Sequence, residues 1–324
     1  MIRLPGSTRL RPRVHFPLAA LLGLSLTFAQ ASGTALTGHS NSVTGLAFVP
    51  GQSMLASSGM DGRVILWDLN RHSAVRTFQN PEGELYAVAV SADGTLLAAG
   101  GEQGRVTVWD RATGAVRATL DSSLAETLHL AFSPDGTTLA VGSGDDRIRL
   151  WSVASGQLKR TLTGHAARVT AVKFSSDGRT LLTSAEDISV RAWNVSSGQE
   201  IWNRRGRTNS YALDVQPGAA VVAAAYSDGE TTTVTFLELS SGKELRSVQH
   251  PASIVTSIAF SPDGSRLALG TYDNDVQLWD VASGKVLDVL KGHTAIVLSV
   301  AYSPDGTLLA SGGDDNTVLL WLTK

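Results

Sequence analysis

Six of the seven tryptophans recur at an almost constant interval, and this interval constrains the fold more than any other feature of the sequence. Successive tryptophans are 42, 42, 42, 86 and 42 residues apart, so the long gap equals two periods with two extra residues. The six positions are Trp67, Trp109, Trp151, Trp193, Trp279 and Trp321. A period of this length is typical of repeat proteins, in which each unit packs against its neighbours. We therefore predict a single array of repeats rather than two unrelated domains.

One repeat contains four short runs of residues that favour β-strands. In the fourth repeat these runs lie at residues 169–174, 181–184, 190–193 and 200–203, and turn residues separate them. Three repeats have Ser-Pro-Asp-Gly in their first turn, where proline presets the backbone of the second position and glycine suits the fourth. No segment shows the sustained period of an amphipathic helix. The pattern predicts short antiparallel strands joined by tight turns.

Two dipeptides accompany this period and carry a family resemblance. Gly-His occurs near the start of three repeats, at residues 38–39, 164–165 and 292–293. Trp-Asp ends three repeats, at residues 67–68, 109–110 and 279–280. With these motifs the chain resembles the WD-repeat β-propeller family over essentially all of residues 32–324. The resemblance implies an all-β fold, a single closed seven-bladed propeller whose blades are four-stranded antiparallel sheets.

The fifth repeat departs most from the others. Leu237 stands where the tryptophan belongs, and the second hairpin, around residues 227–230, is about three residues longer than in the other repeats. We also expect its first turn, at residues 216–218, to be one residue shorter. Together these changes account for the two extra residues in the gap of 86.

The last repeat lacks a fourth strand of its own, because the chain stops three residues after Trp321. Residues 34–37 resemble the fourth strands of other repeats. We predict that this N-terminal strand completes the last blade, which would close the ring and cover an edge prone to aggregation.

The first 31 residues have the order of a secretory signal peptide. Four arginines precede an apolar run at residues 16–28, and Ala29-Gln30-Ala31 follows as a small-residue cleavage pattern. We predict that residues 1–31 are the signal peptide and residues 32–324 the mature propeller, exported to the periplasm or secreted. Cleavage would change the formal net charge from −2 to −6. The alternative is a disordered or uncleaved leader. No later apolar stretch is long enough to hold the mature chain in a membrane.

Composition excludes several other classes. With 43% apolar and 17% charged residues, the chain is neither intrinsically disordered nor a multi-span membrane protein. The absence of cysteine excludes a disulfide scaffold, a cysteine nucleophile and a thiolate zinc site. The net charge gives no electrostatic case for nucleic-acid binding.

Three repeats share a second set of residues at fixed distances from their tryptophan. A histidine lies 28 residues before it, a hydroxyl residue ten before it and an aspartate six before it. The sets are His39, Ser57, Asp61 and Trp67; His165, Thr183, Asp187 and Trp193; and His293, Ser311, Asp315 and Trp321. Repeats without the histidine have Ala99, Val141, Leu269 or, in repeat five, Ala223 at the hydroxyl position.

Histidine and hydroxyl therefore occur together or not at all. A buried polar group without its partner destabilises the fold by about 1–3 kcal/mol, so partial networks are disfavoured. The family resemblance implies a hydrogen-bonded chain that ties the strands of one blade. Serine, histidine and aspartate are also the residues of an acyl-transfer triad, which makes a hydrolase the minority alternative. We favour the structural interpretation because the set occurs in three repeats, once with threonine.

The resemblance also places two groups of loops on one rim of a central channel. The candidate partner-binding residues there are Met60, Glu84, Glu102, Glu126, Arg168, Glu186, Tyr211, Tyr272 and Asp314. A mainly acidic rim with a few large side chains suits a basic peptide or protein segment. The alternative is that these loops are simply solvated and charged.

We expect no metal site and no cofactor. Residues 273–275 and 314–316 are rich in oxygen ligands, but similar turns favour aspartate and asparagine for backbone reasons. The sequence thus predicts a noncatalytic, monomeric, exported platform that binds an unknown protein or peptide and not nucleic acid. The alternative functions are a small-ligand or metal sensor that uses the channel, and a hydrolase.

Overall fold

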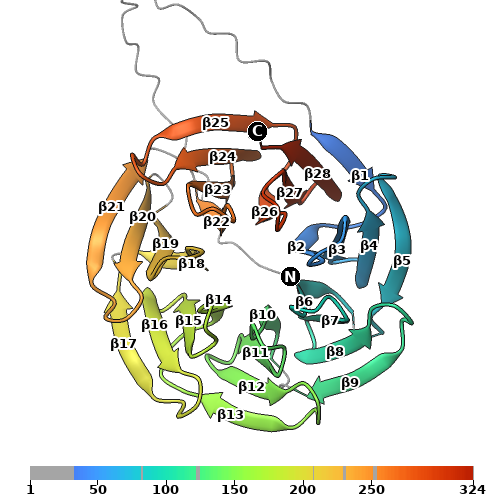
Figure 1. The fold of residues 1–324 in the computed structure, drawn as a ribbon, viewed down its shortest axis with the longest axis horizontal. Helices are drawn as coiled ribbons and strands as arrows, with labels where there is room; N and C mark the ends of the chain where they lie inside the picture. Colours follow the sequence, from blue (N-terminus) through green and yellow to red (C-terminus); the bar gives the residue numbers. More distant parts are fainter. Residues whose placement is uncertain are drawn as a thin grey trace, which may run out of the picture. The chain divides into compact units, whose positions relative to one another are not determined.

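The computed structural model describes residues 33–323, apart from residues 82, 122–124, 207, 229–230 and 251–253. This part of the chain forms seven four-stranded antiparallel sheets arranged in a ring, and it contains no helix (Figure 1). The all-β class and the seven-bladed propeller predicted from the sequence are therefore confirmed. We number the blades one to seven by the order of their innermost strands in the chain.

The strands fall into four concentric sets. The innermost strands of blades one to seven are β2 (Val43–Phe48), β6 (Leu85–Val90), β10 (Thr127–Phe132), β14 (Val169–Phe174), β18 (Asn209–Val215), β22 (Val255–Phe260) and β26 (Val297–Tyr302). The second strands are β3 (Met54–Gly59), β7 (Leu96–Gly101), β11 (Thr138–Ser143), β15 (Thr180–Ala185), β19 (Val221–Ser227), β23 (Arg266–Thr271) and β27 (Leu308–Gly313). The third strands are β4 (Arg63–Asp68), β8 (Arg105–Asp110), β12 (Ile148–Ser152), β16 (Ser189–Asn194), β20 (Thr232–Glu238), β24 (Asp275–Asp280) and β28 (Thr317–Leu322). The outermost strands are β5 (Ser73–Gln79), β9 (Val116–Asp121), β13 (Leu158–Leu162), β17 (Glu200–Arg205), β21 (Glu244–His250), β25 (Val286–Lys291) and, in blade seven, β1 (Thr34–Thr37).

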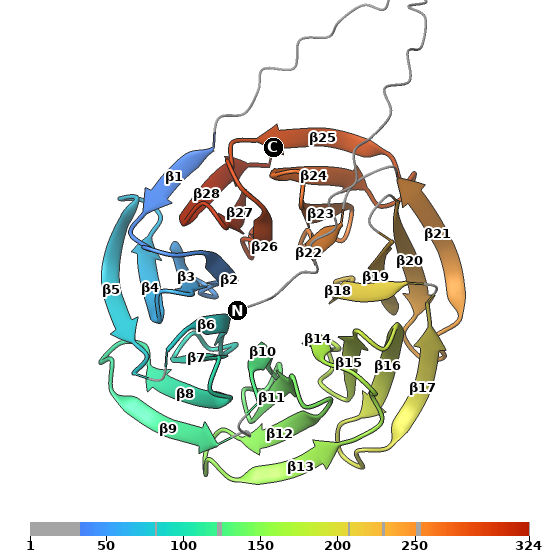
Figure 2. The ribbon, with the colours of Figure 1, turned by 180° about the vertical axis from the view of Figure 1, so that it is seen from behind.

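The N-terminal strand closes the ring. Strand β1 pairs antiparallel with β28, with Leu36 opposite Val318, and so supplies the missing outer strand of blade seven (Figure 2). The innermost strands of blades seven and one, β26 and β2, contact each other as other neighbouring blades do. Closure by residues 34–37, as predicted, is consistent with this sheet.

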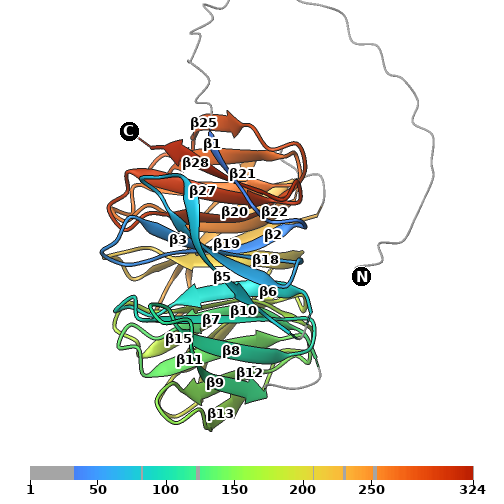
Figure 3. The same ribbon diagram turned by 90° about the vertical axis from the view of Figure 1, so that its right-hand side faces the viewer.

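The core is divided among the interfaces between blades. Seven apolar clusters are buried, and each takes its residues from two neighbouring blades. The cluster between blades seven and one, for example, joins Val318 and Leu320 to Leu55 and Trp67. Because large aromatic side chains bury the most apolar area, the recurring tryptophans contribute strongly to these interfaces. The strands run between two faces of the ring, where the connecting loops lie (Figure 3).

The fifth blade confirms two expectations, the buried leucine and a second hairpin that is three residues longer, and corrects two others. Leu237 is fully buried opposite Val222, the position that Trp193 takes opposite Leu181 in blade four. The first turn is not shorter, because six residues separate Val215 from its partner Val222, as in the other blades. The missing residue lies instead in the connection from β17 to β18, between the paired positions Arg204 and Ser210.

This register also changes one assignment in the fifth repeat. Thr183 pairs with Val172 on the inner strand of blade four, and the residue that pairs with the corresponding Leu213 in blade five is Ala224. Ala224, rather than Ala223, therefore occupies the hydroxyl position. Both residues are alanine, so the conclusion that blade five lacks the hydroxyl is unchanged.

The predicted signal peptide, residues 1–31, lies outside the described residues. Across the part of the chain that the structure does describe, no helix has the length and apolar character needed to span a membrane.

Candidate functional site

A chain of four hydrogen-bonded side chains runs through blade one. The indole Nε1 of Trp67 donates to Ser57 Oγ at 2.8 Å, and Ser57 Oγ lies 2.7 Å from His39 Nε2. The other ring nitrogen, His39 Nδ1, lies 3.0 Å from Asp61 Oδ2. Since Ser57 accepts from the indole, its own proton is free to be donated to Nε2, which places the imidazole proton on Nδ1.

Blades four and seven contain the same chain. In blade four, Trp193 Nε1 and His165 Nε2 both lie 2.8 Å from Thr183 Oγ1, and His165 Nδ1 lies 3.0 Å from Asp187. In blade seven the matching distances are 2.8, 2.8 and 2.9 Å, for Trp321, Ser311, His293 and Asp315. Each chain joins the loop before the inner strand to the second strand, the following turn and the third strand.

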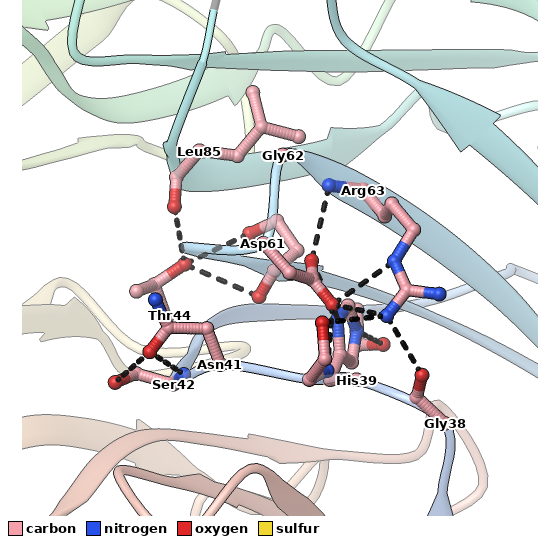
Figure 4. A network of polar contacts seen from close by, with 12 residues as sticks. Gly38, His39, Asn41, Ser42, Thr44, Asp61, Gly62, Arg63 and Leu85 are labelled. Atoms are coloured by element: carbon pink, nitrogen blue, oxygen red, sulfur yellow. Dashed lines mark hydrogen bonds and ion pairs between the residues drawn. The ribbon is translucent and has the colours of Figure 1, made fainter.

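Each aspartate has further donors that the sequence did not indicate. Asp61 accepts from the backbone N–H of Ser40 at 2.9 Å and pairs with Arg63 Nη2 at 2.7 Å (Figure 4). The equivalent backbone donors are Ala166 in blade four and Thr294 in blade seven. No sequence signal distinguished these groups, because backbone donors are not encoded by residue type. They show that the carboxylate organises the loop as well as the imidazole.

The surroundings hold the imidazoles of His39 and His165 neutral and the three carboxylates ionised. Burial lowers the pKa of His39 and His165, and the nearby aspartates only partly oppose this. Burial by itself raises the pKa of Asp61, but hydrogen bonds from the Ser40 backbone, His39 and Arg63 outweigh it and bring that pKa below its usual value. Asp187 and Asp315 are shifted in the same direction. The protonation states therefore match the donor directions.

The side chains are connected as in a hydrolytic triad, but a substrate cannot reach the hydroxyl. Ser57 is 0% exposed, and its oxygen already accepts a hydrogen bond from Trp67. A nucleophile must approach a substrate carbon closely, and this hydroxyl has no open side. Thr183 and Ser311 are equally buried. The geometry therefore supports strand tying within a blade.

Blades three and six show what happens without the histidine. In blade three, where Val141 occupies the hydroxyl position, the buried Trp151 Nε1 has no hydrogen-bond partner among the described residues. In blade six, with Leu269 at that position, Trp279 Nε1 lies 3.2 Å from Gln277 Oε1. Gln277 is a partner that sequence reasoning missed.

A second group of residues forms one face of the ring. In six blades of the described chain, a backbone hydrogen bond joins the residue after the second strand to the residue before the inner strand. Six predicted rim residues donate or accept in this way in four of the blades, namely Met60, Glu84, Glu102, Glu126, Arg168 and Glu186. Tyr272 and Asp314 donate in the remaining two bonds of the same kind, to Ile254 and Ile296. The repeated bond places these residues on a common face.

Three of the rim carboxylates gather around one tyrosine near the channel. Tyr86 donates to Glu84 Oε2 at 3.0 Å. Burial raises the pKa of Tyr86, and the charges of Glu84, Glu126 and Glu102 raise it further. Arg168 pairs with Glu126 at 2.6 Å and so limits the acidic cluster on the side of blade four. We call Glu84, Glu102, Glu126 and Tyr86 the acidic cluster.

The other predicted rim residues are more scattered. Glu186 is exposed beside Arg168, Tyr272 is 40% exposed and Met60 is half-buried. Asp314 accepts a short hydrogen bond from Ser42 across the interface of blades seven and one. Tyr211 lies in strand β18, but its side chain is outside the described part of the structure.

Two inner strands carry charged groups that sequence reasoning missed. Lys173 and Asp214 pair at 3.2 Å from neighbouring inner strands. The five equivalent residues of the other blades are all alanine, namely Ala47, Ala89, Ala131, Ala259 and Ala301. An alignment of the repeats would have revealed both charged exceptions.

His129 faces the channel close to Lys173. Both residues line a cavity of about 140 Å³ together with the inner strands of all seven blades. The imidazole of His129 is exposed to the channel. Desolvation by the surrounding protein nevertheless lowers the pKa of His129, and the charge of Lys173 lowers it further. No group of three histidine or carboxylate residues in the described ranges could hold a metal ion.

Comparison with known families agrees with this architecture. The family model described as IFT122 first beta-propeller matches residues 27–271. The model for the WD domain, G-beta repeat, matches residues 284–321, and the Anaphase-promoting complex subunit 4 WD40 domain matches residues 246–298. A search of curated proteins found no match.

Proposed function

Because the chain belongs to the WD-repeat β-propeller family, we propose that it is a noncatalytic platform that binds another protein or a peptide. Propellers of this family are commonly scaffolds for protein interactions. A ring of stiff blades with loops on both faces offers broad binding surfaces without any catalytic group.

The observation that carries the proposal is the acidic cluster beside the channel. Glu84, Glu102 and Glu126 come from two neighbouring blades. Glu84 accepts a hydrogen bond from Tyr86, and the charges of all three lie near enough to this phenol to raise its pKa beyond the effect of burial. Like charges held together repel one another, and a cationic partner relieves this repulsion. A lysine- or arginine-rich segment is therefore the partner that fits this face.

We further propose that the platform works after export. The support is the order of residues 1–31, in which basic residues, a short apolar run and a small-residue cleavage pattern follow one another. The mature chain would be mildly acidic, with a formal net charge of −6. This charge adds a weak long-range attraction for basic partners.

The noncatalytic part of the proposal rests on burial. The three residue sets that imitate a triad are closed inside blades one, four and seven, where each hydroxyl is bound by an indole. Labelling of Ser57 by a fluorophosphonate probe on the folded protein, abolished in Ser57→Ala, would contradict it.

Charge reversal on the rim tests the binding face. We expect Glu102→Lys combined with Glu186→Lys to weaken binding of a lysine- and arginine-rich peptide by about tenfold or more at low salt, measured by calorimetric titration. The loss should shrink as salt is raised, because exposed charges are screened within about 10 Å at 0.1 M. Glu238→Lys, at the end of β20 on the opposite face, is the matched control. If the rim and control variants bind the peptide with equal affinity, this face is not the binding site.

A second candidate is a sensor of a small ligand in the channel. The specific observation is that His129 and Lys173 line the channel cavity where other blades have small residues, with Asp214 paired to Lys173. A ligand-dependent rise in melting temperature that is lost in Lys173→Ala would favour this function over the platform.

A further inference from the structure

Blades one, four and seven, which we call the tied blades, contain the histidine network and have a small residue next to the imidazole. Blade five has Tyr226 at the position of that small residue. The register that pairs Val43 with Gly59 and Val297 with Gly313 pairs Ser210 with Tyr226. A Cβ atom at Gly59 would lie 2.7 Å from His39 Nδ1, and one at Gly313 would lie 2.6 Å from the equivalent nitrogen of His293. Small residues at this position therefore leave space for the imidazole.

In blade five both the imidazole and its hydroxyl partner are missing. The connection from β17 to β18 is one residue shorter than its counterparts and carries no Gly-His. The Tyr226 side chain lies in this region, packed so closely under Gly206 that a Cβ there would lie 2.2 Å from the ring. The aromatic ring is thus held in place by the glycine of the shortened connection.

A pocket of about 480 Å³ lies beside this tyrosine, between blades four and five. Its blade-five wall includes a cross-strand row, in which Tyr226 pairs with Thr233 and Thr233 with Gln249. Blade four contributes Arg204 and Arg205 from the end of β17. The volume is in the range of sites that hold small molecules.

Several groups in this pocket are available for a ligand. Tyr226 is only 5% exposed, yet its hydroxyl has no hydrogen-bond partner among the described residues. Arg205 likewise makes no ion pair in the described part of the chain, whereas Arg204 is bound to Glu244 at 2.7 Å.

The available groups define the chemistry of the ligand. A guanidinium and a phenol donate hydrogen bonds and suit a carboxylate, which accepts a bidentate pair from arginine. Thr233 and Gln249 offer the mixed donors and acceptors that sugar hydroxyls need. Glu244 and Asp228 also line the pocket and balance the two arginines, so the wall favours a single negative charge over a doubly charged phosphate.

We propose that the pocket between blades four and five binds a sugar acid, with its carboxylate on Arg205 and Tyr226 and its hydroxyls along the row of Thr233 and Gln249. The site is independent of the acidic cluster, which lies on blades two and three. The proposed site lies where the tied blades have their histidine network, which blade five lacks.

The test is a titration of the mature protein with D-glucuronate and D-galacturonate, followed by calorimetry or ligand-observed NMR. We expect one of the two to bind, and D-glucose, which lacks the carboxylate, to bind at least tenfold more weakly. Tyr226→Phe removes only the hydroxyl and should weaken binding about tenfold to a hundredfold, as loss of one hydrogen bond to a charged group does. Arg205→Gln should do the same.

Two variants serve as controls. Tyr302→Phe removes another hydroxyl without a partner in the described structure, and Arg179→Gln removes an exposed arginine in blade four; both should retain full affinity. Unchanged melting temperatures show that each variant is folded. The proposal is overturned if neither sugar acid binds, if D-glucose binds equally well, or if Tyr226→Phe and Arg205→Gln leave the affinity unchanged.

Discussion

A single imidazole connects three structural elements in each tied blade, and its protonation state decides whether it can do so. His39 accepts from Ser57 through Nε2 and donates to Asp61 through Nδ1, so a second proton would remove the acceptor. The lowered pKa of His39 and His165 prevents this near neutral pH. The residue acts as a structural bridge because burial keeps it neutral.

Removing one imidazole tests the bridge. We expect His165→Ala to lower the free energy of unfolding by about 2–4 kcal/mol, since it removes the acceptor of the buried Thr183 hydroxyl and one donor to Asp187, and opens a void. Urea denaturation followed by tryptophan fluorescence measures this change. His129→Ala, in the channel and without a hydrogen bond in the described structure, should cost much less. An unchanged stability in His165→Ala would refute the structural interpretation.

The stability should also depend on pH in a defined direction. Because the pKa of His39 and His165 is lowered from 6.5 on folding, the unfolded chain binds protons that the folded chain does not as pH falls below about 6.5. Stability is therefore greatest above this pH and declines below it. The lowered pKa of Asp61, Asp187 and Asp315 adds a further loss in more acidic solution.

Melting temperatures at pH 8, 6.5 and 5 check this dependence. The wild type should lose stability between pH 6.5 and 5, and His165→Asn should lose less over the same interval because one buried imidazole is gone. Equal losses in the two proteins would show that the histidine does not cause the effect.

The residue types and their spacing showed that histidine and hydroxyl occur together, and the family resemblance implied that they form one network with the aspartate. Equivalent repeat positions lie at equivalent places in each blade, so the prediction applied to all three repeats. Contacts between blades were not predictable in this way. The Lys173–Asp214 pair depends on how two inner strands lie side by side. The contact of Arg63, at the start of β4, with Asp61 depends on a turn whose conformation the sequence did not specify. The Tyr226 hydroxyl can bind a ligand because blade five lacks the histidine that the tied blades have at this place.

At the scale of single elements, the four-residue strand β1 has a large structural role. Its hydrogen bonds to β28 complete blade seven, and Leu36 joins the buried cluster between blades seven and one. A short strand is unstable alone, so its stabilising effect comes from this packing and from removing an open sheet edge.

Truncation of the buried leucine measures this role. Leu36 is 1% exposed and Leu322, on the paired strand β28, is 76% exposed. We expect Leu36→Ala to destabilise the protein by about 2–5 kcal/mol and Leu322→Ala to have almost no effect, as judged by urea denaturation. Similar small effects of the two substitutions would mean that β1 does not close the ring.

The error in the fifth blade has a physical origin. Residues 221–225 are all valine or alanine, so alternation between polar and apolar residues cannot fix which of them face the core. The alignment from the turn was therefore free to slip by one residue. In the structure the pairing of Val222 with Leu237 sets the register and moves the deletion into the connection from β17 to β18.

At the scale of the whole propeller, the repeat period predicted a single array, and the family resemblance together with the incomplete last repeat predicted a closed ring of seven blades. Such a ring is stable because each blade buries its faces against two neighbours. The same regularity limits what the sequence says about function. Binding depends on the loops and on departures from the repeat, such as the acidic cluster and the atypical fifth blade. Residues 1–31 add the proposal that binding takes place after export.

The most direct test of the platform is quantitative affinity capture with the mature propeller, residues 32–324, from the compartment to which it is exported. Wild type, the Glu102→Lys/Glu186→Lys variant and the Glu238→Lys control are compared by mass spectrometry. We predict a protein with an exposed basic segment that is captured by wild type and Glu238→Lys and reduced about tenfold or more with the rim variant. Capture of the same proteins at equal amounts by all three would contradict binding through the acidic rim.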